Sequence, residues 1–152
     1  MRVYSSTCQD FIRDVGTGQI AAIVERAYTR AYGHSTSESE IRSWKNSLAA
    51  LSNILDHGDV PSDLGLGIEF QIPKTSKRID VLLSGTSALD ESSVLILELK
   101  QWEFANKTTM DGVVNTFVGG GNRDVQHPSY QSWSYAQLLR DFAVVVEDES
   151  MI

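Results

Sequence analysis

Three charged residues interrupt two apolar stretches of the chain and are the first candidates for chemistry. Asp80 lies in the run over residues 78–83, and Glu98 and Lys100 lie in the run over residues 94–100. If the second run is a strand, Glu98 and Lys100 point to the same face, because side chains alternate along a strand. A cation held between Asp80 and Glu98 would neutralise these buried charges, with Lys100 facing a phosphate or a water molecule. A structural ion pair between Lys100 and either acid is the plainer alternative.

This arrangement requires a sheet that brings the two runs together. Both runs are short, aliphatic and bounded by Ser/Gly-rich sequence, which is typical of strands. The polar connection over residues 84–93 contains Gly85 and is short enough to favour an antiparallel pair. A third aliphatic run precedes them. We therefore expect strands over much of 66–72, 78–83 and 94–100, as neighbours in one sheet.

Apolar spacing predicts two helices before the first of these strands. Residues 19–32 carry an apolar stripe and are followed by Gly33, where a helix stop is expected. A second helix begins at Ser37, which fits a capping box with Glu40, and this helix ends at Gly58.

The segments around these elements give weaker signals. Residues 1–18 indicate no more than a short edge strand over residues 1–4. Residues 110–118 are expected to form a strand that turns at 119–122 and pairs back over 123–126 as a hairpin.

A last helix is expected to begin at Pro128 and to run to about Val146. On it, Gln131 and Tyr135 are four residues apart and share a face. The apolar stripe on this face continues through Leu138 or Leu139, Phe142 and Val145. A glutamine at the head of such a stripe is costly unless it meets a polar partner. If the stripe packs on the sheet, both residues lie near one end of the strands; alternatively, Gln131 reaches solvent and Tyr135 belongs to the core.

The order of an Asp, a Glu-x-Lys and a later Gln-x-x-x-Tyr resembles the RecB-type branch of the PD-(D/E)XK nuclease superfamily. A wider match resembles the nuclease-like segment that precedes a Schlafen-related helicase/ATPase domain in prokaryotic proteins. It covers about residues 25 to 146 and is carried by four blocks, residues 39–44, 77–80, 98–102 and 127–135. The resemblance implies an α/β fold with a restriction-endonuclease-like core, in which helices flank a central mixed sheet.

The resemblance also implies hydrolysis of nucleic-acid phosphodiester bonds, with DNA favoured over RNA. Asp80 and Glu98 would hold Mg²⁺ or Mn²⁺, and the Leu99 carbonyl would be an extra ligand. Lys100 would orient the attacking water or neutralise developing charge. Residues on the last helix, Gln131 and Tyr135, would position the nucleic-acid strand or the lysine.

Members of the superfamily often add an acidic residue from the first core helix. Glu40 is the first candidate here and Glu25 the second, although the capping box gives Glu40 a complete structural explanation. Glu69 is a minor candidate that either joins the metal site or faces solvent. His127 is a candidate general base, but its place before Pro128 favours a structural role at the start of a helix.

The sequence departs from the family pattern in three ways. Ile79, rather than proline, precedes Asp80, and no Walker motif is present. The chain also stops soon after the last helix, where the family core supplies a further strand. We therefore expect residues 1–152 to form a single nuclease-like domain that lacks a final core strand, and the helicase/ATPase to be a partner or another domain.

Composition restricts the setting. The net charge of −7 argues against tight nonspecific binding of nucleic acid by this domain alone, so a partner is expected to do most of the holding. Cys8 is the only cysteine and no His/Cys cluster indicates zinc, so a reducing cytoplasm is the expected compartment. No apolar run approaches the roughly 20 residues of a membrane span.

Two other functions remain open from the sequence. The first is a non-catalytic module with a nuclease-like fold that docks nucleic acid or a partner, for which exposed Trp102 or Trp133 would serve as contact residues. The second is a structural fragment that has lost its final strand and is inactive alone.

Overall fold

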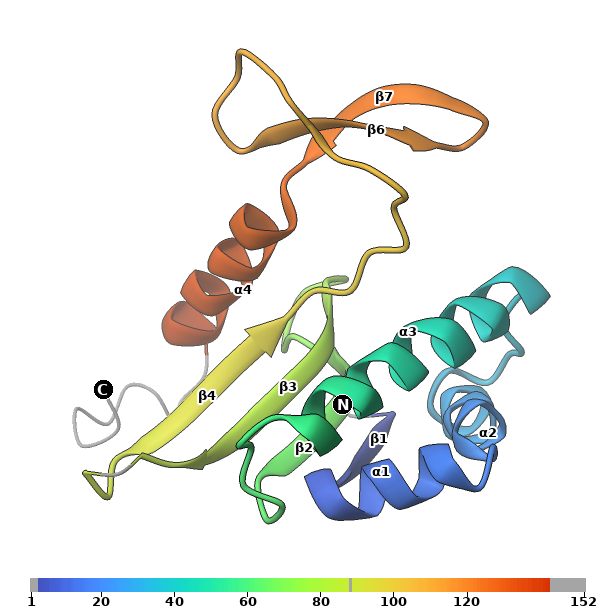
Figure 1. Cartoon of the computed structure of the whole chain (residues 1–152), viewed down its shortest axis with the longest axis vertical. Coiled ribbons are helices and arrows are strands. Elements are labelled where there is room, and N and C mark those ends of the chain that lie inside the picture. The colour runs from blue at the N-terminus through green and yellow to red at the C-terminus, as the bar shows by residue number, and fades with distance from the viewer. Residues whose placement is uncertain (1–2, 88, 143–152) are drawn as a thin grey trace.

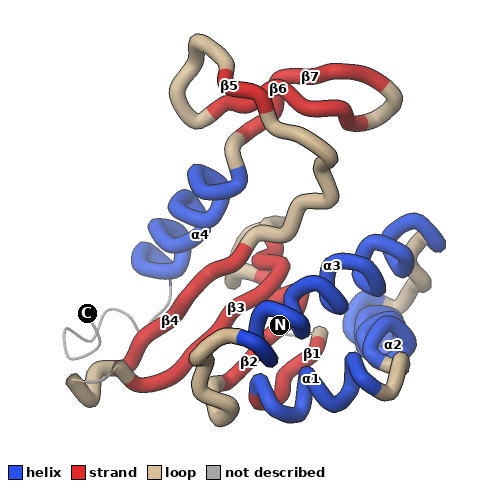
Figure 2. The backbone as a smooth tube through the Cα atoms, in the orientation of Figure 1, coloured by secondary structure: helices blue, strands red, loops and turns tan. Residues whose placement is uncertain are grey.

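The computed structural model describes residues 3–87 and 89–142, which form an α/β fold with four helices and two antiparallel sheets (Figures 1 and 2). In chain order the elements are β1 (Tyr4–Thr7), α1 (Cys8–Gly16), α2 (Ile20–Tyr32), α3 (Glu38–His57), β2 (Gly65–Gln71), β3 (Arg78–Thr86), β4 (Ser92–Leu97), β5 (Asn106–Lys107), β6 (Val113–Val118), β7 (Gly121–Gln126) and α4 (Pro128–Phe142).

The larger sheet has the order β1-β2-β3-β4, and each neighbouring pair is antiparallel. The prediction that the three aliphatic runs are neighbouring strands is therefore confirmed. The prediction of a mixed sheet is wrong for the strands described. Strands β2, β3 and β4 are antiparallel because the connections from β2 to β3 and from β3 to β4 are too short for a crossover, so the chain must reverse direction.

Strand β4 ends at Leu97, so the strand predicted over 94–100 is wrong for its last three residues. The last pair of the β3–β4 ladder joins Val81 and Leu97. Glu98 and Lys100 therefore follow the strand rather than lying on it, and strand alternation does not decide where their side chains point.

The predicted helices over residues 19–32 and from Ser37 to Gly58 are confirmed as α2 and α3. Gly33 ends α2 in the left-handed conformation, and the Ser37 side chain accepts a hydrogen bond from the backbone N–H of Glu40 at the start of α3. Helix α4 is described to Phe142, and Val145 and Val146 lie outside the described residues. None of the helices in these ranges is long and apolar enough to cross a membrane.

The first described residues hold a strand that lies later than expected and a helix that the sequence signal missed. Strand β1 begins at Tyr4 rather than covering residues 1–4, of which the first two lie outside the described residues. Helix α1 follows without a loop, and Thr7 caps it by accepting a hydrogen bond from the Asp10 backbone N–H. Phe11 anchors α1 because its side chain is fully buried.

The larger sheet packs differently on its two faces. Helices α1–α3 cover one face over a core that includes Phe11, Val24, Leu48, Ile68 and Val81. Helix α4 lies on the other side, beside β4, where Tyr135 packs with a smaller cluster (Figure 1). The candidate residues on β3 thus lie in a sheet that has helices on both sides.

The second sheet has the order β5-β6-β7 and stands away from the larger one, at the N-terminal end of α4 (Figure 2). Strands β6 and β7 confirm the predicted hairpin, although β6 begins at Val113 rather than at residue 110. Gly119 and Gly120 both have positive φ, as the tight connection requires.

Candidate active site

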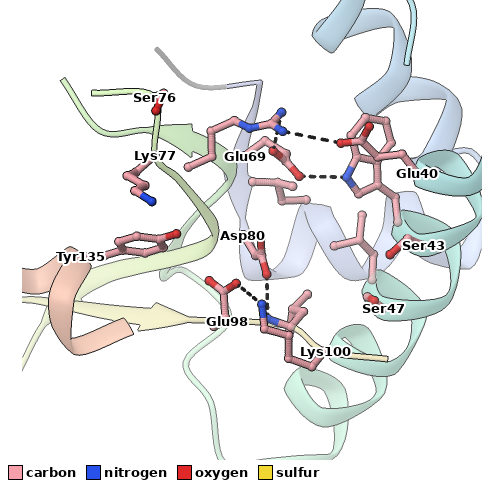
Figure 3. Close-up of a pocket in the computed structure, with 15 residues that line it drawn as sticks. Glu40, Ser43, Ser47, Glu69, Ser76, Lys77, Asp80, Glu98, Lys100 and Tyr135 are labelled. Carbon is pink, nitrogen blue, oxygen red and sulfur yellow. Dashed lines mark hydrogen bonds and ion pairs between the residues drawn. The ribbon is translucent and has the colours of Figure 1, made fainter. Parts of the chain in front are cut away.

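A cavity of about 410 Å³ opens between α3, the sheet and α4 (Figure 3). It lies where β4 ends, so its wall includes the residues that leave the strand. The sequence-predicted residues that line it are Glu40, Glu69, Asp80, Glu98, Leu99, Lys100 and Tyr135. Gln131 touches this wall through its hydrogen bonds to Glu98 and Tyr135. Glu25, the second helix candidate, is on α2 and is not among the lining residues.

Asp80 is fixed by the backbone of the segment that follows β4. Its Oδ2 atom accepts a hydrogen bond of 2.8 Å from the Leu99 N–H. Burial raises the pKa of Asp80, while the Leu99 N–H and the nearby Lys100 charge oppose that shift. The carboxyl group is thus held in a defined position inside the cavity wall.

Glu98 lies beside Asp80 (Figure 3), and each carboxyl group affects the pKa of the other. Only 3% of the Glu98 side chain is exposed. Burial, together with the neighbouring Asp80 carboxylate, raises the pKa of Glu98 to about 7 although Lys100 opposes the shift. Near neutral pH, Glu98 therefore holds a proton more readily than an exposed glutamate does.

The two oxygens of Glu98 have different surroundings. Oε1 accepts from Lys100 Nζ at 2.6 Å and from Gln131 Nε2 at 2.5 Å. Oε2 is buried and has no donor from the described residues. An ionised carboxylate oxygen left in this state is costly, so this atom is suited to a proton or to a cation.

Gln131 and Tyr135 meet the site as a pair. The Gln131 amide donates to Glu98 Oε1 and also to the Tyr135 hydroxyl at 2.9 Å. The alternative in which Gln131 reaches solvent is therefore wrong. Tyr135 is buried and packs in the α4 cluster, so it is a core residue and a cavity residue at once. Phe142, expected on the same stripe, has no described side chain, and Val145 lies outside the described residues.

The donor set fits one hard divalent cation. Carboxylate oxygens are the ligands that Mg²⁺ and Mn²⁺ prefer, and Mg²⁺ commonly uses one or two carboxylates together with water. Glu98 Oε2 supplies a buried oxygen without a donor, next to the Asp80 carboxyl group. No cluster of three or more His, Cys, Asp or Glu side chains suited to a metal occurs in the described ranges. Any cation here would thus depend on two carboxyl groups.

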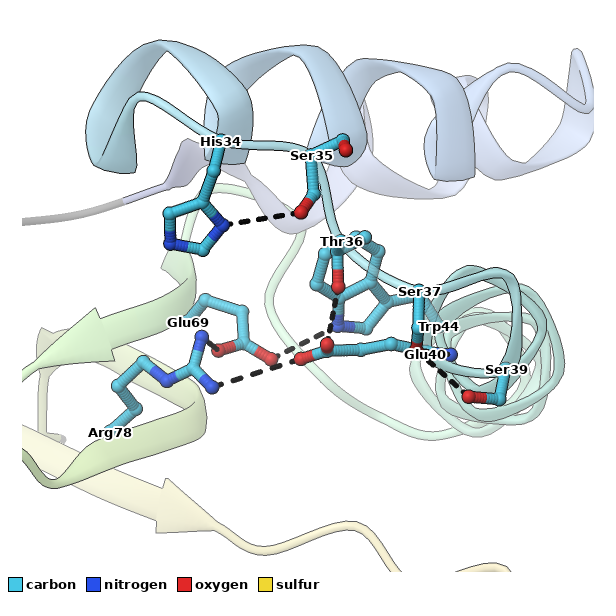
Figure 4. A network of polar contacts seen from close by, with 9 residues as sticks. All are labelled: His34, Ser35, Thr36, Ser37, Ser39, Glu40, Trp44, Glu69 and Arg78. Carbon is cyan, nitrogen blue, oxygen red and sulfur yellow. Dashed lines mark hydrogen bonds and ion pairs between the residues drawn. The ribbon is translucent and has the colours of Figure 1, made fainter.

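The other end of the cavity holds a second polar cluster (Figure 4). Glu40 accepts from the Thr36 hydroxyl, and its carboxylate lies 3.7 Å from the Arg78 guanidinium. Glu69 lies 3.1 Å from Arg78 and accepts a 3.0 Å hydrogen bond from Trp44 Nε1. Both glutamates therefore already have partners, and Glu69 is buried rather than facing solvent.

Sequence reasoning missed Trp44 and Arg78 as members of this cluster. Glu69 offered a signal, because a carboxylate between the apolar residues Ile68 and Phe70 must find a partner when its strand is buried. Arg78 lies on β3, the strand that pairs with the strand of Glu69, so its side chain was an available partner for Glu69.

His127 has the structural role that its sequence position favoured. It is exposed, and its Nδ1 accepts from the Ser129 backbone N–H at the start of α4. It does not line the cavity.

Comparisons of the chain with protein-family models, with curated proteins and with solved structures found no match.

Proposed function

We propose that the chain is a metal-dependent nuclease domain with a restriction-endonuclease-like core, which hydrolyses phosphodiester bonds of nucleic acid, DNA in preference to RNA. The observation that supports this most directly is the buried Glu98 Oε2 atom, which lies beside Asp80 and has no donor in the described residues. A purely structural acid pair would be stabilised by donors on each oxygen. Here one buried oxygen, Glu98 Oε2, has no donor in the described residues.

Asp80 and Glu98 are the side chains that would hold Mg²⁺ or Mn²⁺, with the Leu99 carbonyl as a further ligand. When bound there, the cation lowers the pKa of a coordinated water and stabilises negative charge on the scissile phosphate. Asp80 is oriented for this by the Leu99 N–H, and Glu98 by the donors on its Oε1 atom.

Lys100 supplies positive charge at the same wall. Its ammonium has three donors, and one of them is used by Glu98 at 2.6 Å. The others can donate to a water molecule or to a phosphate oxygen, where they would stabilise charge that develops during hydrolysis. Gln131 and Tyr135 position Glu98 from the α4 side.

The charge of the chain supports a cooperating partner. A protein with a net charge of −7 gains little from long-range attraction to a phosphate backbone. We propose that a helicase/ATPase, on another chain or domain, delivers the nucleic acid, and that both work in the cytoplasm.

Labelled single- and double-stranded DNA and RNA, incubated with Mg²⁺, Mn²⁺ or chelator, test the proposal. The expected result is cleavage that needs a divalent cation and is lost in Asp80→Ala. Asp59→Ala is the matched control, because Asp59 is exposed and outside the cavity. Cleavage that persists in chelator, or in Asp80→Ala, would reject the mechanism.

A docking module is the second candidate, and one observation favours it. Trp133 is 55% exposed and Tyr130 is 51% exposed, and their rings pack 5.4 Å apart on α4. Exposed aromatic pairs serve as stacking or protein-contact sites. By contrast, Trp102 is only partly exposed and lies 6.0 Å from the Lys100 ammonium.

Mn²⁺ calorimetry separates the two functions, since a docking module does not need a cation. Under the nuclease proposal, wild-type protein binds Mn²⁺ and Trp133→Ala binds it equally well. Wild-type protein that binds nucleic acid but no Mn²⁺, with nucleic-acid binding lost in Trp133→Ala, would favour the docking module.

A further inference from the structure

The side-chain alternation of two neighbouring strands changes at Glu69 and Asp80. On β2, Ile68 packs in the core under α1–α3, whereas Phe70 packs in the α4 cluster. On β3, Val81 packs under α1–α3, whereas Ile79 packs in the α4 cluster. Residues two apart on a regular strand share a face, so both strands turn between these positions.

The two turning points lie opposite each other. The pairing passes from Ile68–Val81 to Phe70–Ile79, and Glu69 and Asp80 are the residues between these two pairs. Glu69 has a φ of 52°, in the left-handed region that residues with a Cβ rarely adopt. Such a conformation persists only where surrounding contacts hold it.

Two residues of the second polar cluster, Trp44 and Arg78, hold the Glu69 side chain. Trp44 Nε1 donates to Glu69 Oε1 at 3.0 Å, and Arg78 Nη1 lies 3.1 Å from Oε2 (Figure 4). The Arg78 guanidinium itself lies over the neighbouring rings of Tyr28 and Tyr32, at 5.4 and 5.8 Å from their centroids. A buried carboxylate with these partners cannot swing out without losing both.

We propose that Glu69 is a positioning residue for Asp80: its contacts with Trp44 and Arg78 hold the left-handed backbone that turns β2 and β3 and directs Asp80 into the cavity. The consequence for cleavage rests on the proposed function, but the positioning does not. Without the turn, Asp80 would keep the regular alternation of its strand and leave the Leu99 N–H without its acceptor.

The Leu99 amide reports the position of Asp80 directly, because Asp80 Oδ2 is its acceptor at 2.8 Å. Hydrogen exchange followed by NMR measures its protection without metal or nucleic acid. Asp80→Ala removes the acceptor, so the exchange rate of the Leu99 amide in this variant defines complete loss of the protection. Trp44→Phe keeps an aromatic ring but removes the indole N–H that binds Glu69, together with part of the ring volume. Glu69→Gln removes the charge that pairs with Arg78.

We expect Trp44→Phe and Glu69→Gln each to speed exchange of the Leu99 amide by about tenfold or more, while amides of the paired residues Val81 and Leu97 keep their protection. Tyr4→Phe is the matched control. It removes one hydrogen bond, that from Tyr4 to Asp14, from a buried aromatic residue of the same core, and it should leave the Leu99 amide unchanged.

Unchanged Leu99 exchange in both variants would overturn the positioning role, as would an equal loss at Leu97 and Leu99. The proposed function fails by a different result, namely a wild-type protein that cleaves no nucleic acid while the Leu99 amide responds as expected. If the wild-type protein cleaves nucleic acid, Trp44→Phe and Glu69→Gln should both cleave more slowly than wild type. Neither should be slower than Asp80→Ala.

Discussion

The backbone N–H of Leu99 donates a 2.8 Å hydrogen bond to Asp80 Oδ2, at the point where the β3–β4 ladder stops. Since Val81 pairs with Leu97, a continued ladder would place Leu99 opposite Ile79. The Asp80 carboxylate therefore accepts a hydrogen bond from a backbone N–H that lies beyond the last ladder pair. The hydrogen bond that positions the candidate metal ligand thus lies where the strand ends.

Asp80→Ala and Lys100→Ala should separate metal binding from cleavage. Asp80→Ala removes ligand charge, so it should lose both Mn²⁺ affinity and cleavage. Lys100→Ala removes a cation beside Glu98, so Mn²⁺ affinity should be kept or slightly increased. Its cleavage rate should fall by about 10²–10³, as for loss of one group that stabilises developing charge. Calorimetry with Mn²⁺ and single-turnover cleavage measure the two effects; a Lys100→Ala protein that cuts at the wild-type rate would contradict the role of the lysine.

The pKa of Glu98 predicts how stability depends on pH. Because the folded-state pKa is about 7 and the ordinary value is 4.5, the folded protein holds this proton between these pH values and the unfolded chain does not. The free energy of unfolding should therefore fall as pH rises from about 4.5 to 7, and this contribution should level off above pH 7. Glu98→Gln should reduce that fall by an amount of the order of 1–3 kcal/mol.

Urea unfolding in chelator at several pH values measures this difference. Glu103→Gln is the control, because Glu103 is exposed and lies outside the cavity. Equal pH profiles for Glu98→Gln and wild type would show that Glu98 does not carry the proton.

Gln131→Leu should impair the site while leaving α4 in place. The amide binds both Glu98 and Tyr135, so its loss leaves Glu98 Oε1 to Lys100 alone. We expect the cleavage rate to fall by about tenfold, which corresponds to the ~1.4 kcal/mol of one such hydrogen bond. Gln137→Leu is the control, because it makes the same change on the same helix outside the cavity. The Gln137→Leu protein should cleave at the wild-type rate. Equal rates for the two variants would remove Gln131 from the site.

Strand β4 should be a site of self-association. Of the strands described, only β3 pairs with β4, and Val94 and Leu95 on β4 are 60% and 55% exposed. An open edge with apolar side chains favours pairing with another chain. Leu95→Lys should reduce the increase of the sedimentation coefficient with protein concentration. Leu89→Lys, in an exposed turn, should not change it. Sedimentation velocity with identical results for both variants and wild type would exclude association through this edge.

Local patterns in the sequence were enough to predict the positions of most elements. The capping contact at Ser37, the left-handed Gly33 and the hairpin at Gly119 depend on residues within a few positions of one another. Helix α1 was missed although local signals for it are present, namely the Thr7 cap and the apolar spacing of Cys8, Phe11, Ile12 and Val15.

By itself the sequence determined which residue types are available: Asp80, Glu98 and Lys100 near one another, with Gln131 and Tyr135 on one helix face. Tertiary structure decided how they meet. Glu69 adopts its left-handed backbone next to Trp44 and Arg78, which lie on other elements. Asp80 accepts from the N–H of Leu99, nineteen residues along the chain, just beyond the last pair of the β3–β4 ladder. These contacts join residues far apart in sequence, and their free energy arises only when the helices and the sheet pack together, so no local pattern can encode them.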